Sequence, residues 1–324
     1  MCHIPDKDMR SLFRKYSFII ILSAILPLFS GCSTGVEGTK TIRMTKTERR
    51  ELMPSAEQVF VADMKSDPLS DWQQGKRFLV SDEKAAVVLR STDGSSDNLK
   101  GAVLIYNKVE SRRTPAGAEE AVILFSGNGR ELRYSTGRSI ADSYKELTAS
   151  DVPMLIDLDL VDKALRLLTG KKVWTMSNLW YDADGNIARG VKYVPVTITG
   201  VQPGDKVFPL LVSFKDASGS EFGMWMSVRN DGNQASAGAS RWFGNLFSLS
   251  DPRLGHQEID DAVWELICTG KVREGMTKEE CRLSLGNPDE VDSGHDWNST
   301  LDIWRYQNGT FLRFQDGKLA NFRN

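Results

Sequence analysis

The chain has 324 residues, of which 40% are hydrophobic, 26% are charged and 9% are aromatic. This balance is that of a globular protein of two or three compact units, and it excludes a collagen-like or disordered chain. The 41 Lys and Arg residues are matched by 43 Asp and Glu residues, so we do not expect nucleic acid as a partner.

A signal peptide is predicted for residues 1–31. Basic residues, including Lys7, Arg14 and Lys15, precede an apolar run from Phe18 to Phe29, which is the pattern of a secretory signal. The run is shorter than the roughly 20 apolar residues that a membrane-spanning helix requires, so we do not expect it to remain as a membrane span.

The residues from Leu28 to Cys32 resemble the cleavage site of bacterial lipoproteins. The resemblance implies that Cys32 carries acyl chains such as palmitate and becomes the first residue of the mature chain. It also implies the outer membrane, because Ser33 rather than an aspartate follows the cysteine. Phe29 stands where the family has leucine, and a free secreted protein is the alternative. Two or three acyl chains anchor a protein stably, at about 0.8 kcal/mol per buried CH₂.

Beyond the polar tether expected at 32–50, two regions rich in short β-branched and aromatic runs are predicted to be small antiparallel β domains. The first, 51–138, begins with a helix that Pro54 opens. The second, 139–254, contains a helix for which Asp159 is the expected N-cap. Runs of this length, separated by turn residues about every ten positions, favour small barrels or sandwiches. Their number and length resemble those of SH3-like barrels, which implies that fold for both regions.

The two β regions resemble each other, and both begin with Gly-Lys. A shift of 89 residues places Gly101 on Gly190 and Phe125 on Phe214. This similarity predicts an internal duplication. The alternative is two unrelated meanders that share common turn residues.

The C-terminal region, 255–324, is predicted to hold two helices and three strands. The second helix has Thr277 as its N-cap with Glu280 three residues later, which is a capping box. Asp316-Gly317 is a strong hairpin signal between the last two strands. The expected arrangement is a helix pair packed on a three-stranded meander.

These C-terminal residues resemble the SmpA/OmlA (BamE-like) domain of bacterial outer-membrane lipoproteins, over about 60 of the 324 residues. The resemblance implies a β-lactamase-inhibitor-like fold, an envelope location and protein binding, and it supplies no catalytic residue. Cys281 stands where the family has valine, which implies that it points into the core. The family motif is carried by Gly275, Met276, Thr277, Gly286, Pro288, Trp304, Tyr306, Asp316 and Gly317.

No catalytic residue, metal or cofactor is predicted. After removal of the signal peptide only His256 and His295 remain, and no zinc-ligand spacing is present. The run 182–186 resembles the start of a calcium loop but lacks the distal glutamate, so it is predicted to be a hairpin turn. Cys268 and Cys281 form either a disulfide or two buried free thiols, and the sequence leaves both alternatives open.

Five aromatic residues of the second β region have two alternative roles. They either pack in the core or line a ligand groove. They are Trp174, Trp180, Tyr181, Trp225 and Trp242.

The combined expectation is a lipid-anchored protein of the outer membrane, facing the periplasm, with a mixed helix and antiparallel-sheet fold. We expect a non-enzymatic role in outer-membrane biogenesis or maintenance, through binding of a protein or another cell-envelope partner. One alternative is an envelope hydrolase or peptidoglycan-processing enzyme with an unfamiliar site. Another is an inhibitor-like binding module.

Overall fold

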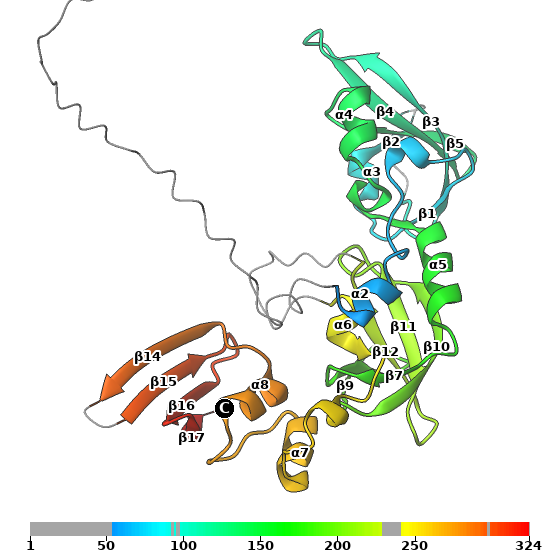
Figure 1. The fold of residues 1–324 in the computed structure, drawn as a ribbon. Helices are drawn as coiled ribbons and strands as arrows, with labels where there is room; N and C mark the ends of the chain where they lie inside the picture. Colours follow the sequence, from blue (N-terminus) through cyan, green and yellow to red (C-terminus); the bar gives the residue numbers. More distant parts are fainter. Residues whose placement is uncertain (1–53, 92–93, 95–97, 229–240, 297–298, 324) are drawn as a thin grey trace, which may run out of the picture. The chain divides into compact units, whose positions relative to one another are not determined.

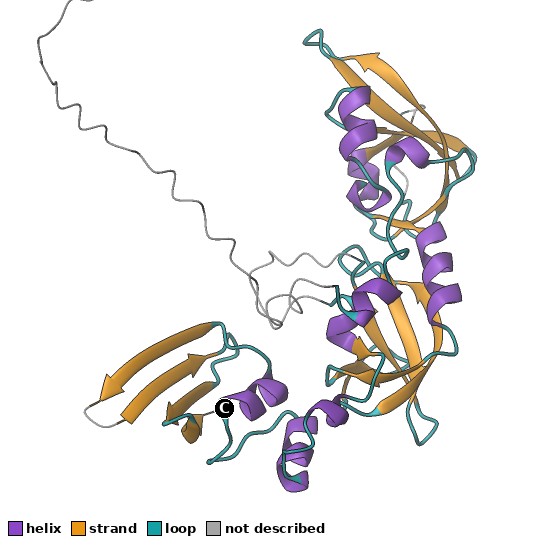
Figure 2. Cartoon of the chain, viewed as in Figure 1, coloured by secondary structure: helices purple, strands orange, loops and turns teal. Residues whose placement is uncertain are grey.

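The computed structural model describes residues 54–91, 94, 98–228, 241–296 and 299–323. Residues 52–324 belong to one compact unit. The predicted signal peptide, Cys32 and the tether lie outside the described residues. The fold is a mixed α/β structure of antiparallel sheets with short helices (Figures 1 and 2). No helix in the described ranges is both long and apolar enough to span a bilayer.

The first sheet has six strands in the order β2-β5-β4-β3-β1-β6. Its core joins the rings of Trp72, Phe78, Tyr106 and Phe125 in tilted and edge-to-face contacts. The strands are β1 (Arg77–Val80), β2 (Leu89–Ser91), β3 (Val103–Arg113), β4 (Glu119–Gly127), β5 (Arg130–Ser135) and β6 (Leu155–Asp157).

Helical segments precede, interrupt and follow this sheet. Because β6 pairs with β1, the first sheet ends at residue 157 and not at the predicted boundary of 138. The short buried run of β6 directly precedes a helix, so the sequence did not reveal it as a strand. The segments are α2 (Ala56–Phe60), η1 (Leu69–Asp71), α3 (Ala85–Val88), α4 (Ile140–Glu146), η2 (Ala149–Asp151) and α5 (Leu158–Leu168).

Asp157, and not the predicted Asp159, is the N-cap of α5. Its Oδ1 accepts hydrogen bonds from the backbone N–H groups of Asp159 (3.1 Å) and Leu160 (3.3 Å). Asp157 ends β6 with an extended backbone, which is the conformation of a cap residue, whereas Asp159 is already within the first helical turn.

The second sheet has seven strands in the order β13-β7-β10-β11-β12-β8-β9. The buried face of α5 packs against β10, and Leu160, Val161, Ala164 and Leu168 belong to the core of this sheet. Its elements are β7 (Lys172–Thr175), β8 (Leu179–Tyr181), β9 (Ile187–Arg189), β10 (Pro195–Pro203), β11 (Leu210–Lys215), β12 (Glu221–Met226), α6 (Phe243–Leu246) and β13 (Phe247–Ser248).

The two sheets share one topology. Read from one edge, the first has the order β6-β1-β3-β4-β5-β2 and the second has β13-β7-β10-β11-β12-β8, with β9 added at the end. The corresponding strands follow one another along the chain in the same sequence. Both sheets also carry a β-bulge at the same place, between Tyr106 and Lys108 in β3 and between Ile198 and Gly200 in β10. The agreement supports an internal duplication.

The predicted equivalence of Phe125 with Phe214 agrees with this topology. Phe125 lies opposite Tyr106, and Phe214 lies opposite Ile198, which are the residues just before each bulge. The separation is 125 − 106 = 19 residues in the first sheet and 214 − 198 = 16 in the second. The shift between the copies therefore changes by three residues across this hairpin.

For this reason the predicted equivalence of Gly101 with Gly190 is wrong. The N–H of Gly101 donates to the carbonyl of Val80, and the corresponding donor in the second sheet is Tyr193, whose N–H donates to Thr175. Both donors have a left-handed backbone, with φ of 82° for Gly101 and 62° for Tyr193. A bulky residue rarely adopts this conformation, so surrounding contacts must hold Tyr193 in it.

The C-terminal region contains four strands and not the predicted three. The additional strand, β14, is polar except for the exposed Val291, and it pairs with β15 from Glu290 opposite Arg305 to Asp296 opposite Ser299. An edge strand needs backbone pairing on one side only, so β14 lacks the apolar alternation that marked the others. The elements are η3 (Pro252–Gly255), α7 (Asp261–Cys268), α8 (Lys278–Leu285), β14 (Glu290–Asp296), β15 (Ser299–Arg305), β16 (Phe311–Gln315) and β17 (Lys318–Arg323).

A buried lysine joins β1 to the start of α5. Lys76 is 6% exposed, and its Nζ lies 2.9 Å from Oδ1 of Asp157, which is 4% exposed. Asp67 and Asp159 each lie 3.4 Å from the same nitrogen. Burial acts to lower the pKa of Lys76, but the three carboxylates outweigh it and the pKa is raised.

We predict that Lys76→Met lowers the free energy of unfolding by about 3–5 kcal/mol, because Asp157 would be left buried without its cation. Urea denaturation measures the change. The matched control is Arg77→Met, since Arg77 pairs with Asp162 at the exposed surface, where a salt bridge contributes less than about 1 kcal/mol. An equal loss of unfolding free energy in the two variants would contradict the role of Lys76 as the buried partner of Asp157.

Candidate functional site

Two residues of the predicted family motif, Gly275 and Met276, join the loop before α8 to the last strand by backbone hydrogen bonds. The N–H of Gly275 donates to the carbonyl of Leu319 (2.8 Å), and the N–H of Leu319 donates to the carbonyl of Met276 (2.7 Å). Thr277 caps α8, its Oγ1 accepting from the N–H of Glu280 while the Glu280 carboxylate accepts from the N–H of Thr277. These residues position α8 on the sheet.

The other motif residues close the core and the turns. Trp304 is buried against Phe314, and the hydroxyl of Tyr306 donates to the carbonyl of Gly286 (3.1 Å), which ends α8. Asp316, at the turn with Gly317, accepts a hydrogen bond from the N–H of Thr300 (3.0 Å) through its Oδ1. Pro288 follows α8 and is half-buried.

Cys268 and Cys281 are free thiols in the structure. Cys281 is buried among the core residues of the C-terminal region, as the family resemblance implied, and burial raises its pKa to about 12. Cys268 is half-buried at the end of α7, and burial raises its pKa as well.

The run 182–186 forms the turn of the β8–β9 hairpin, as predicted. Asp182 accepts backbone hydrogen bonds from Asp184 (3.0 Å) and Asn186 (2.8 Å), which satisfies its Oδ1 within the turn. His256 stacks on Trp264. Across the described ranges, no three His, Cys, Asp or Glu side chains are grouped so as to hold a metal.

The second sheet and the C-terminal helices are joined by two neighbouring residues of the β9–β10 connection, Lys192 and Tyr193. The N–H of Lys192 donates to the carbonyl of Cys268 (2.9 Å), at the end of α7. The hydroxyl of Tyr193 donates to the carbonyl of Leu283 (2.9 Å) in α8, and its ring lies 5.1 Å from that of Trp264. These contacts hold Tyr193 in its left-handed backbone conformation.

The side chain of Lys192 ends at the C-terminus of α8. Its Nζ donates to the carbonyls of Leu283 (2.6 Å) and Ser284, which lie at the helix end where the dipole favours a cation. Lys192 is 7% exposed, and no carboxylate among the described residues pairs with it. Burial therefore lowers its pKa from 10.5 to about 8.

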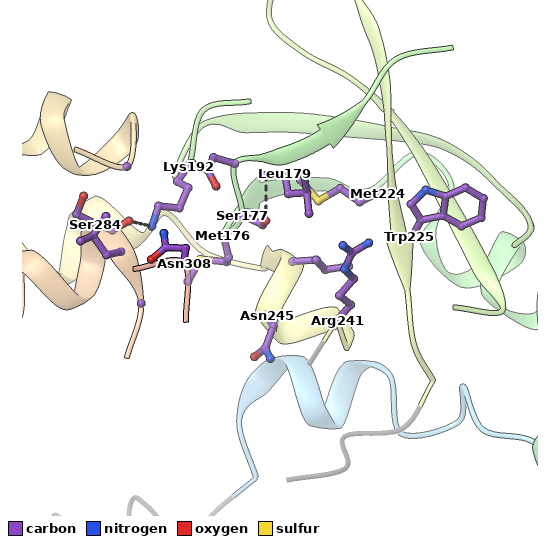
Figure 3. A pocket seen from close by; sticks show the side chains of 15 residues that line it. Met176, Ser177, Leu179, Lys192, Met224, Trp225, Arg241, Asn245, Ser284 and Asn308 are labelled. Carbon is purple, nitrogen blue, oxygen red and sulfur yellow. Dashed lines mark hydrogen bonds between the residues drawn. The ribbon is translucent and has the colours of Figure 1, made fainter. Parts of the chain in front are cut away.

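A cavity of about 470 Å³ opens beside Lys192 (Figure 3). Its lining combines two cations, Lys192 and Arg241, with three asparagine amides, and no aspartate or glutamate of the described ranges belongs to it. Such a lining favours an anion and disfavours a cation. The lining residues are Met176, Ser177, Asn178, Leu179, Lys192, Met224, Trp225, Arg241, Asn245, Leu246, Gly270, Ser284, Leu285, Gly286 and Asn308.

Arg241 is held in place by aromatic residues. Both terminal nitrogens of its guanidinium lie 3.3 Å from the hydroxyl of Tyr181, and the guanidinium lies 4.5 Å from the centre of the Phe208 ring. Trp225 packs edge-to-face on Tyr181. Both Tyr181 and Trp225 also line an adjoining cavity of about 310 Å³, so Trp225 contributes to two neighbouring cavities.

The aromatic residues of the second β region therefore divide between the two predicted roles. Trp180 is buried and packs on Phe214 and Phe222. Tyr181 and Trp225 line cavities. Trp174 and Trp242 are half-buried.

Lys192, Tyr193 and Arg241 were not predicted as site residues. Lys192 and Tyr193 lie in a run that reads as an ordinary strand, and their importance depends on the helices that cover them. One signal in the sequence could have pointed to them. Lys100-Gly101 occupies the place of Lys192-Tyr193 in the first sheet, and its glycine marks a left-handed backbone position.

Comparison of the chain with models of protein families, with curated proteins and with solved structures finds no match. The functional argument therefore rests on the geometry of this cavity and on the sequence.

We predict that the buried lysine makes stability depend on pH. Between pH 8 and 10.5 the unfolded state binds more protons than the native state, because the pKa of Lys192 is about 8 only when it is buried. The free energy of unfolding of the wild type, relative to Lys192→Met, should rise across this window by up to about 1.4 kcal/mol per pH unit.

Denaturation of both proteins from pH 7 to pH 9.5 measures the difference. Lys172→Met, which removes an exposed lysine of β7, is the matched control. If the difference in unfolding free energy between the wild type and Lys192→Met did not change with pH, the pKa of Lys192 would not be lowered by burial.

Proposed function

We propose that this is a lipid-anchored cell-envelope protein that acts by binding and not by catalysis. The observation that carries the proposal is the cavity beside Lys192, which two parts of the chain build together and which offers cations and amides without a carboxylate. Preformed cavities of this size that carry a few charged or polar groups are typical of small-molecule binding sites.

The hydrogen bonds inside the cavity favour binding over catalysis. A serine nucleophile needs a base within hydrogen-bonding distance. In the part of the chain that the structure describes, the Lys192 ammonium donates to carbonyl oxygens. The Ser284 hydroxyl donates to the carbonyl of Lys271 (2.6 Å).

The envelope hydrolase is the second candidate function. It is favoured by Lys192 itself, because a buried lysine with a pKa near 8 is the kind of group that serves as a base, and Ser177 lines the same cavity. Reaction of the protein with a fluorophosphonate probe, lost in Ser177→Ala, would favour the hydrolase over the binding protein.

We propose further that residues 255–324 form a module of the SmpA/OmlA (BamE-like) kind and that the two preceding sheets, which meet at residue 157, belong to SH3-like domains. The support is the order of two helices followed by an antiparallel meander, and the structural use of Gly275, Thr277, Trp304 and Tyr306. The shared topology of the first two sheets supports a duplicated domain.

The anchor in this proposal is the acylated Cys32, in the outer membrane and facing the periplasm. A tether of about 20 residues has an end-to-end distance on the order of 25 Å. The body would thus be confined close to the membrane, which raises its effective concentration toward envelope partners.

We predict that Cys32→Ala releases the protein from the membrane fraction, because the acyl chains would have no attachment site. Cell fractionation measures the distribution, and mass spectrometry of the amino-terminal peptide measures the acyl mass. Cys2→Ala is the matched control, since Cys2 lies in the predicted signal peptide. A Cys32→Ala protein that stays in the membrane fraction after cleavage would overturn the anchor.

A further inference from the structure

We propose that the cavity beside Lys192 binds a sugar that carries an acidic group, with the acid at Lys192, while Arg241 adds a second positive charge to the lining. This inference deepens the proposed binding function and names its ligand class. It does not depend on the lipid anchor.

The first argument is the missing counter-ion of Lys192. Lys76, the other buried lysine among the described residues, lies within 3.4 Å of three carboxylates. Lys192 is buried to the same degree, but its Nζ contacts two neutral carbonyl oxygens and the ring of Tyr193, 5.5 Å away, with no carboxylate among the described residues. A buried charge is costly without a partner of opposite sign. An anion in the adjoining cavity would supply that partner.

The second argument is the hydrogen-bonding capacity that remains at Lys192. An ammonium group has three N–H bonds, and two of them are used by Leu283 and Ser284. The helix end holds the nitrogen in place, so the third N–H is available to a ligand oxygen with little loss of side-chain entropy. The site is therefore preorganised for one acidic oxygen.

The third argument is the second cation on the wall formed by the second sheet. Arg241 is oriented by Tyr181 and Phe208, and a guanidinium binds carboxylate and phosphate oxygens well. Figure 3 shows Lys192 and Arg241 among the side chains that surround the cavity. With no acidic side chain in the lining, the two cations favour the same kind of ligand.

The remaining lining is suited to hydroxyl groups. The amides of Asn178 and Asn308 both donate and accept hydrogen bonds, as sugar hydroxyls do. Trp225 lies at the edge of the lining, with its ring turned away from Lys192 in Figure 3, and it also lines the second cavity. A volume of about 470 Å³ admits one substituted sugar ring.

Isothermal titration calorimetry of the full chain in detergent tests the proposal. N-Acetylmuramic acid is compared with N-acetylglucosamine, its neutral parent, and glucose 6-phosphate is compared with glucose. At least one acidic sugar should bind 10-fold or more tightly than its parent. Whichever pair shows the difference identifies the acid as a carboxylate or a phosphate.

Variants locate the binding. Lys192→Met and Arg241→Gln should each weaken binding of the acidic sugar at least 10-fold, while Lys172→Met, which removes an exposed lysine outside the lining, should bind like the wild type. Circular dichroism identifies variants that fail to fold, and Arg241→Gln keeps the test decisive if Lys192→Met is unfolded.

Three results would overturn the proposal. They are equal binding of acidic and neutral sugars, absence of binding by both acidic sugars at millimolar concentration, and an equal loss in Lys172→Met. The membrane attachment of Cys32→Ala is measured independently of sugar binding. A failure of the proposed ligand class can therefore be distinguished from a failure of the proposed anchored protein.

Discussion

The C-terminal end of α8 is completed by side chains from elsewhere in the chain. The last carbonyls of any helix lack partners within the helix. Here Lys192 and Tyr193 bond the carbonyl of Leu283, Lys192 also bonds that of Ser284, and Tyr306 bonds that of Gly286. The position of the C-terminal helices on the second sheet depends on these bonds, and so does the cavity, because Lys192, Ser284 and Gly286 all line it.

The two sheets share a topology but differ in where they bury a lysine. In the first sheet Lys76 is buried against carboxylates, and Lys100, the counterpart of Lys192, is exposed to solvent. In the second sheet the C-terminal helices cover Lys192, while Lys171, the counterpart of Lys76, is exposed. The same strand order thus carries a structural ion pair in the first sheet and a cation beside a cavity in the second.

Much of the fold was predictable because strands and helices with one apolar face leave a clear periodicity. The mixed architecture with antiparallel sheets, the capped helix at Thr277 and the turns at 182–186 and 316–317 all have local signals. The polar strand Glu290–Asp296 and the short strand Leu155–Asp157 have none, since pairing with a distant strand defines them. The candidate site was not predictable, because Lys192 becomes buried only when α8, whose Leu283 lies 91 residues later in the chain, packs on it.

The cavity has walls from two parts of the chain, the second sheet with its connections and the end of α8. An occupant that contacts both walls adds its interaction free energy to the association of those parts. By thermodynamic reciprocity, whatever strengthens or loosens that association changes the affinity for the occupant by the same factor. A force on the C-terminal helices, or a protein that competes for them, would thus change the occupancy of the cavity without any movement in the sheet itself.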